Sequence, residues 1–204
     1  MSLIRDEIVR IARAEATPAP HGKVSDLVRD GEGRRAGWQH LKKYFDDAVA
    51  GWSESKWSDR GSIKIGEQAV KLTNLEGIQK PGLRVIQGAS KPSGVSWCGI
   101  FATWVWRQAG LKAVVWHQGL GPRGNGVTIV NKTTGFQRGD IIVIRSGEVH
   151  HAIVAEMPSV YDVDTEGNPD KTIVTVNGNS TYQSIRVHSE YRLQDVAYYY
   201  TFPD

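Results

Sequence analysis

The sequence is poor in sulfur, since its 204 residues include one cysteine, Cys98, and two methionines. A single cysteine excludes an intramolecular disulfide and any zinc site built from several cysteines. Long apolar runs are missing too, because no stretch reaches the 18 or so residues that a membrane-spanning helix needs. The histidines are scattered except for one adjacent pair. We therefore predict no metal site, no cofactor and no stable membrane insertion.

A strong charge of one sign is also absent. The 25 basic and 22 acidic residues leave a net charge of +3, which permits an anionic partner without arguing for one. The basic cluster at residues 31–35 is too short to indicate a nucleic-acid partner. Apolar residues make up 40% of the chain and charged residues 23%, fractions that fit a globular core and exclude a disordered or collagen-like chain.

The amino terminus lacks the apolar core of a secretory signal. Charged residues interrupt positions 1–16, whereas Leu3, Ile4, Ile8, Ile11 and Ala12 recur at helical spacing, which predicts an amphipathic helix. We expect synthesis in the cytoplasm without a signal peptide. Any export from the cytoplasm would then use a non-classical route.

The order of the expected elements predicts an α+β fold. Helices are expected at residues 37–50, 67–75 and 98–111, and the last is apolar almost all round, as in a buried central helix. Residues 77–94 form a connection rich in Gly, Pro and Ser. Strands are then expected at residues 112–116, 141–144, 150–156, 172–176, 185–188 and 196–202. At about 150 residues per domain, the length suggests a helical extension over residues 1–60 and a main domain over 61–204, which together can form one compact unit.

Two polar loops resemble binding motifs without completing them. Residues 162–167 resemble the start of a calcium loop, but Ile173 occupies the position of its closing Glu, so an acidic hairpin tip is the better interpretation. Residues 119–126 are rich in glycine but lack the Lys-Ser/Thr ending of a phosphate loop, and we interpret them as a mobile loop beside the site.

Cys98 stands where the apolar helix begins. The first N–H groups of a helix have no intrahelical partner and the helix dipole is positive there, so both effects favour a thiolate. A buried structural cysteine is the alternative.

A nucleophilic cysteine needs a base and a group that orients the base. His150 and His151 stand on a predicted strand, and alternation would turn one toward the helix and the other away. Asn177 and Asn179, two apart at the end of the next strand, are candidates for the orienting role. Ordinary surface histidines and an Asn-Gly turn remain the alternatives.

Three segments together resemble the CHAP-type cysteine amidohydrolases of the wider NlpC-like, papain-like superfamily, across about residues 90 to 180. Residues 96–111 (SWCGIFATWVWRQAGL) resemble the helix that carries the nucleophile. Residues 138–143 (RGDIIV) followed by 150–154 (HHAIV) resemble the Gly-Asp turn into a strand and the strand that carries the histidine. Residues 176–180 (VNGNS) resemble the end of the following strand.

The resemblance implies a papain-like domain in which the nucleophile helix packs on an antiparallel sheet. Cys98 matches the nucleophile, and His150, three residues before Ile153, matches the base. Asn177 stands where many relatives carry an acidic residue, and neutral Asn still accepts an imidazole N–H. Asn179 remains the other candidate. The Cys98 main-chain N–H is a candidate oxyanion donor.

The activity that the resemblance implies is hydrolysis of amide bonds in bacterial peptidoglycan by an N-acetylmuramoyl-alanine amidase or a peptide endopeptidase. Trp97 and Trp116 are candidates to line a substrate groove, with His117 beside them, although core packing explains the tryptophans equally well. A phage lysin or an antibacterial effector with an immunity protein as partner would fit such an activity. A catalytically weak binding module, and a cysteine peptidase or deamidase acting on proteins, are the alternatives.

Overall fold

The computed structural model describes residues 2–29, 35–50, 97–117, 120–124, 126–146, 148–157 and 172–204, together with the backbone of short strands between residues 57 and 85. It combines helices with antiparallel sheets, which confirms the predicted α+β class. None of the helices in these ranges is long and apolar enough to cross a bilayer.

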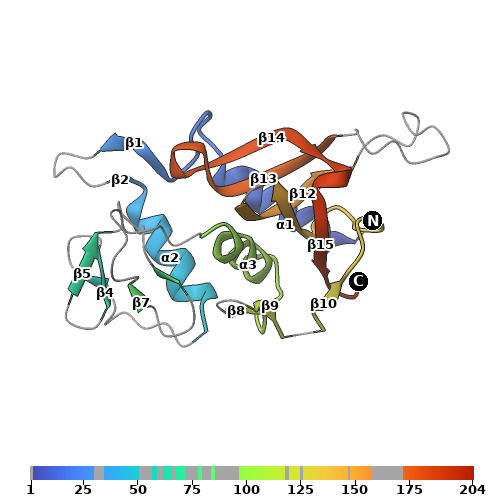
Figure 1. The fold of residues 1–204 in the computed structure, drawn as a ribbon, viewed down its shortest axis with the longest axis horizontal. Helices are drawn as coiled ribbons and strands as arrows, with labels where there is room; N and C mark the ends of the chain where they lie inside the picture. The colour runs from blue at the N-terminus through green and yellow to red at the C-terminus, as the bar shows by residue number, and fades with distance from the viewer. Residues whose placement is uncertain are drawn as a thin grey trace.

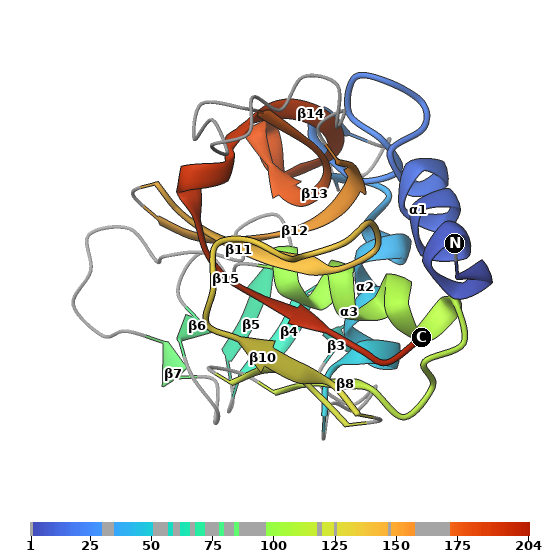
Figure 2. The ribbon, with the colours of Figure 1, turned by 90° about the vertical axis from the view of Figure 1, so that its right-hand side faces the viewer.

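A six-stranded sheet forms one layer of the molecule (Figure 2), and all its neighbouring strands are antiparallel. Strands predicted from runs of Ile and Val form its centre, where both faces bury apolar side chains in two separate clusters. In spatial order the strands are β10 (Thr128–Val130), β15 (Val196–Thr201), β11 (Ile141–Ser146), β12 (Glu148–Glu156), β13 (Thr172–Ser180) and β14 (Ser184–Arg192). Two short 3-10 helices, η4 (Thr181–Gln183) and η5 (Leu193–Asp195), precede β14 and β15.

Helix α3 (Cys98–Gln108) packs against β12 and β13, and its residues 98–106 are all buried. The apolar sequence predicted this burial, because a helix without a polar face has no side to present to water. Gly178 on β13 makes the close approach possible: a Cβ there would lie 2.8 Å from the Phe101 side chain.

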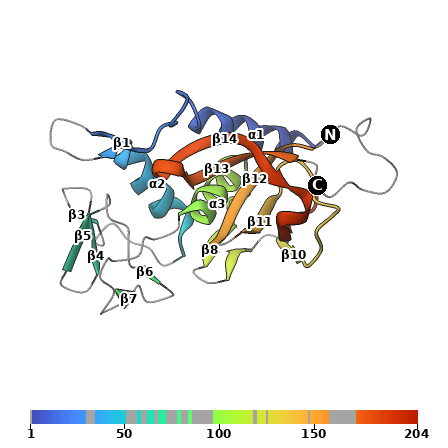
Figure 3. The ribbon, with the colours of Figure 1, turned by 45° about the horizontal axis from the view of Figure 1, so that its top comes forward.

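Helices α1 (Leu3–Glu15) and α2 (Trp38–Ala48) pack against α3 (Figures 1 and 3). Ile8 and Ala12 of α1, and Leu41 and Phe45 of α2, belong to the same core cluster as α3. Leu3, assigned to the apolar face from its spacing, is 86% exposed because it stands at the first position of the helix. The boundary predicted near residue 60 falls outside the described residues.

The expected helix at residues 67–75 is wrong over its described part. Strand β5 (Gln68–Lys71) pairs with β4 (Ser62–Ile65), and Val70 lies opposite Ile63. One apolar pair over so few residues fits a helical and a strand period equally well, and the pairing with β4 decided between them. The other short strands here are β3 (Trp57–Ser58), β6 (Ile78–Gln79) and β7 (Arg84–Val85).

Two further hairpins border the sheet and the helices. Strand β1 (Ser25–Arg29) pairs with β2 (Arg35–Ala36). Strand β8 (Val115–His117) pairs with β9 (Gly121–Arg123), so three of the eight residues expected as a mobile loop form a hairpin strand. The predicted acidic hairpin tip at residues 162–170 lies outside the described residues.

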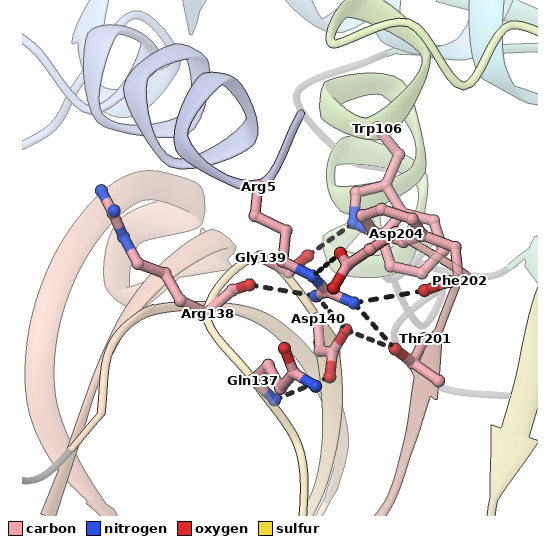
Figure 4. A network of polar contacts seen from close by, with 9 residues as sticks. All are labelled: Arg5, Trp106, Gln137, Arg138, Gly139, Asp140, Thr201, Phe202 and Asp204. Atoms are coloured by element: carbon pink, nitrogen blue, oxygen red, sulfur yellow. Dashed lines mark hydrogen bonds and ion pairs between the residues drawn. The ribbon is translucent and has the colours of Figure 1, made fainter. Parts of the chain in front are cut away.

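A buried ion pair joins α1 to the sheet (Figure 4). Arg5 Nη1 lies 2.7 Å from Asp140 Oδ1, and the two side chains are 5% and 1% exposed. Asp140 also accepts hydrogen bonds from the Thr201 hydroxyl and the Gln137 main-chain N–H, each at 2.7 Å. Arg5 donates further to main-chain carbonyls of Arg138 and Phe202. The pair therefore links the first helix, the turn before β11 and the last strand.

Candidate active site

The start of α3 meets the start of β12. Cys98 Sγ lies 3.7 Å from His151 Nδ1, and the main-chain N–H of His151 donates to the sulfur at 3.4 Å. The β12–β13 ladder begins at the pair Ile153–Val176, so both histidines stand beyond its end. The sequence places the only thiol of the chain at this junction.

A chain of hydrogen bonds holds the other histidine. His150 Nε2 lies 2.9 Å from Asn177 Oδ1, and the Asn177 amide group donates to Thr175 Oγ1 at 2.8 Å. The Thr175 hydroxyl in turn donates to the main-chain carbonyl of His188 at 3.3 Å. The Asn177 amide nitrogen donates to Thr175, so the Asn177 amide oxygen faces His150. Because that oxygen is an acceptor, His150 carries a proton on Nε2. The Nδ1 atom is then the nitrogen available to exchange a proton.

The electrostatics of the site favour an ion pair. Burial raises the pKa of the Cys98 thiol, but hydrogen bonds and charge interactions with His150 and His151 outweigh it and hold the pKa well below its ordinary value. Burial lowers the pKa of His150, but Cys98 and Asn177 outweigh this effect and raise it. The lowered thiol pKa and the raised imidazole pKa both favour the thiolate–imidazolium pair over the neutral pair.

Both histidines interact with Cys98, which corrects the expectation that one of the pair points away. Both histidines remain paired with β11, His150 with Ile144 and His151 with Val143, whereas the β12–β13 ladder begins only at Ile153. His150 reaches toward Asn177 on β13, and His151 packs against Trp116 and Tyr200. Sequence analysis offered either histidine as the base, and the resemblance assigned that role to His150, so a role for both was missed. The adjacent His-His pair was the signal that could have identified it.

Trp116 lies beside Cys98's neighbour Gly99, with its ring over the first turn of α3. A Cβ on Gly99 would lie 2.1 Å from the Trp116 ring, and the ring centroids of Trp116 and His151 are 5.0 Å apart. The indole is 7% exposed. His117, the next residue of β8, is partly buried, and no hydrogen bond or ring contact joins it to Cys98, His150 or His151 in the described structure.

Trp97 does not line a groove, and that prediction is wrong. Its side chain is fully buried and packs against Tyr44 and Phe101. The residue before Cys98 thus anchors the start of α3 to α2. Asn179, the second candidate for the orienting role, has a left-handed backbone with φ of 55° and makes no hydrogen bond to either histidine in the described structure.

Comparison with protein-family models, with curated proteins and with solved structures finds no match to this chain. The geometry therefore carries the functional argument. In the described ranges, no three His, Cys, Asp or Glu side chains gather as a candidate metal site.

Asn177→Ala is expected to lower the turnover number about 10- to 100-fold, because a hydrogen bond to a charged group contributes roughly 1.5–3 kcal/mol. Asn179→Ala is the matched control, with the same side chain two positions away and no contact with His150. Steady-state kinetics of both variants measure the difference. Equal losses in the two variants would contradict the assignment of Asn177 to His150.

Proposed function

We propose that this protein is a cysteine hydrolase that uses Cys98 as nucleophile, His150 as acid and base, and Asn177 to orient His150. The observation that carries the proposal is the gathering of Cys98, the two histidines and Asn177: Asn177 holds His150, His151 lies beside the sulfur, and interaction with the histidines lowers the thiol pKa while the pKa of His150 is raised. A structural cysteine would require none of these partners. The Cys-His-Asn arrangement is a recognised variant of the catalytic triad.

The chemistry follows from the positions of these groups. The Cys98 thiolate attacks the amide carbonyl carbon, a C–S bond forms and the oxygen becomes negative. When the C–N bond breaks, the His150 imidazolium donates its proton to the leaving amine. Water then attacks the thioester while His150 takes one of its protons, and cleavage of the C–S bond releases the acid and restores the thiolate. Main-chain N–H groups in the first turn of α3 are candidate donors to the oxyanion.

As substrate we propose the amide bonds of peptidoglycan, so that the protein is a muramoyl-alanine amidase or a peptide endopeptidase of papain-like fold. Three motifs in the order of the CHAP-type enzymes support this choice, and they include both histidines and Asn177. Cys98 is 1% exposed, so substrate must displace a neighbouring side chain. This burial favours one competing function, a binding module that keeps the site without turnover.

Digestion of purified peptidoglycan tests the proposal. We expect the protein to release fragments with new amine and carboxyl ends, which mass spectrometry identifies and whose masses give the scissile bond. Protein pretreated with iodoacetamide is the control, because the chain offers a single thiol to alkylate. Intact peptidoglycan after prolonged digestion would exclude the substrate. Equal products from alkylated protein, once mass measurement confirms modification of Cys98, would exclude the nucleophile.

A further inference from the structure

We propose that His151 is a second catalytic imidazole, which holds the Cys98 thiolate while His150 moves the proton. This inference rests on the proposed role of Cys98 as nucleophile, and it is independent of the substrate. No motif in the sequence assigned this role to His151, and the resemblance assigned the histidine function to His150 alone.

Two donors of one residue point at the sulfur. The His151 main-chain N–H donates to Cys98 Sγ at 3.4 Å, and the ring atom Nδ1 lies 3.7 Å from the same sulfur, within the range of hydrogen bonds to sulfur. A thiolate is only an acceptor, so this arrangement selects the tautomer with a proton on Nδ1. Both donors belong to one rigid residue and need no reorganisation when the thiolate forms.

Aromatic neighbours fix the His151 ring. The ring stacks on Tyr200 with 6.2 Å between centroids and an interplanar angle of 23°, and it meets Trp116 edge-on at 5.0 Å. His151 is 9% exposed, and its backbone pairs with Val143 in the centre of the sheet. The imidazole is thus held beside the sulfur by packing, whereas His150 is held by an amide oxygen.

The imidazoles of His150 and His151 have different surroundings, and these indicate different roles. His150 has a hydrogen-bond acceptor, Asn177 Oδ1, that supports its positive charge. Within the described structure, the hydrogen-bond and ring contacts of the His151 side chain are with Cys98 and two aromatic side chains, and none of these contacts supplies an anion besides the thiolate. Tyr200 stays neutral, since burial and the neighbouring Tyr198 raise its pKa. His151 therefore acts as a fixed donor to the thiolate.

This role covers both halves of the reaction. In acylation the Cys98 sulfur uses an electron pair to form the C–S bond and loses its negative charge. The two N–H donors of His151 then no longer face an anion. When water breaks the thioester, the C–S electron pair returns to the sulfur and the same donors receive the charge. His151 thereby assists departure of the thiolate without gaining or losing a proton.

Titration of the single thiol tests the inference without any substrate. His151→Phe keeps an aromatic ring and the main-chain donor but removes Nδ1, and we expect the titration midpoint of Cys98 to rise by about one to two pH units. Thiolate ultraviolet absorbance, with Cys98→Ala subtracted, measures the midpoint without requiring access to the sulfur. His151→Asn places an amide donor near the Nδ1 position and should recover part of the shift. His40→Phe, on α2, is the control for loss of a histidine.

The His150→Ala variant separates the two roles. Its turnover should fall further than that of His151→Phe, while the double variant should titrate like an ordinary buried thiol. An unchanged midpoint in a folded His151→Phe protein would overturn the inference. So would abolished turnover in His151→Phe alongside normal turnover in His150→Ala, because the base would then be His151. If the midpoint shifts but wild-type protein leaves peptidoglycan intact, the substrate proposal fails and the role of His151 stands.

Discussion

Cys98→Ala is expected to lower the rate of amide hydrolysis by about 10⁴- to 10⁶-fold, the range found when a nucleophile is removed from a catalytic triad. The loss is this large because the covalent pathway disappears and His150 has no thiolate to pair with. The main-chain N–H groups at the start of α3 then have no covalently formed oxyanion to stabilise. Initial rates on peptidoglycan or on a defined muropeptide measure the effect.

The fold should survive this change. Alanine removes one buried sulfur atom, which costs on the order of 1 kcal/mol of unfolding free energy, and it also relieves the burial of a charge. Circular dichroism and urea unfolding of Cys98→Ala therefore serve as the control. A folded variant that retains a tenth or more of the wild-type rate, as an order-of-magnitude threshold, would show that hydrolysis proceeds without the thiol.

Arg5→Ala is expected to reduce the free energy of unfolding by about 3–5 kcal/mol, because it leaves the Asp140 carboxylate buried without its counter-ion. The pair is at 2.7 Å and almost entirely shielded from water. The guanidinium also lies 4.5 Å from the centre of the Phe202 ring, a contact that alanine cannot make. Urea unfolding at neutral pH measures the loss.

Asp204→Ala is the matched control for this pair. Asp204 accepts from Arg5 Nε at 2.6 Å, but its side chain is 54% exposed, and an exposed partner contributes at most about 1 kcal/mol. A loss in Arg5→Ala no larger than that in Asp204→Ala would contradict the proposed importance of burial. Activity of the remaining folded Arg5→Ala protein should be close to wild type, since Arg5 makes no contact with Cys98, His150 or His151 in the described structure.

Much of the fold follows from local sequence patterns. The apolar run of residues 98–106 predicts a buried helix, and the runs of Ile and Val in β11 and β12 predict buried strands. These signals are local, because an element that is buried on all sides has apolar residues at every position and no regular spacing of polar ones. The segment that forms β5 gave an ambiguous signal, because its four residues fit a helix and a strand equally well. Strand β4, with which it pairs, lies outside the segment.

Part of the candidate site could likewise be predicted from the sequence, and part needed the structure. Its residue types and their order identified Cys98, His150 and the Asn177–Asn179 pair, but spacing alone left the two asparagines equivalent. The contact with His150 distinguishes Asn177, and the amide donated to Thr175 fixes which atom faces the imidazole. Thr175 was overlooked because a threonine in a strand carries no functional signal of its own.

The sequence by itself determined the buried helix, the central strands β11 and β12 and a thiol at a helix start, because each depends on neighbouring residues. Only the tertiary structure decided that His151 also reaches the sulfur and that Arg5 pairs with Asp140, 135 positions away. The first depends on how α3 packs against β12, and the second on how α1 docks against the turn before β11. Both arise from the packing of elements distant in the chain, which no local pattern specifies.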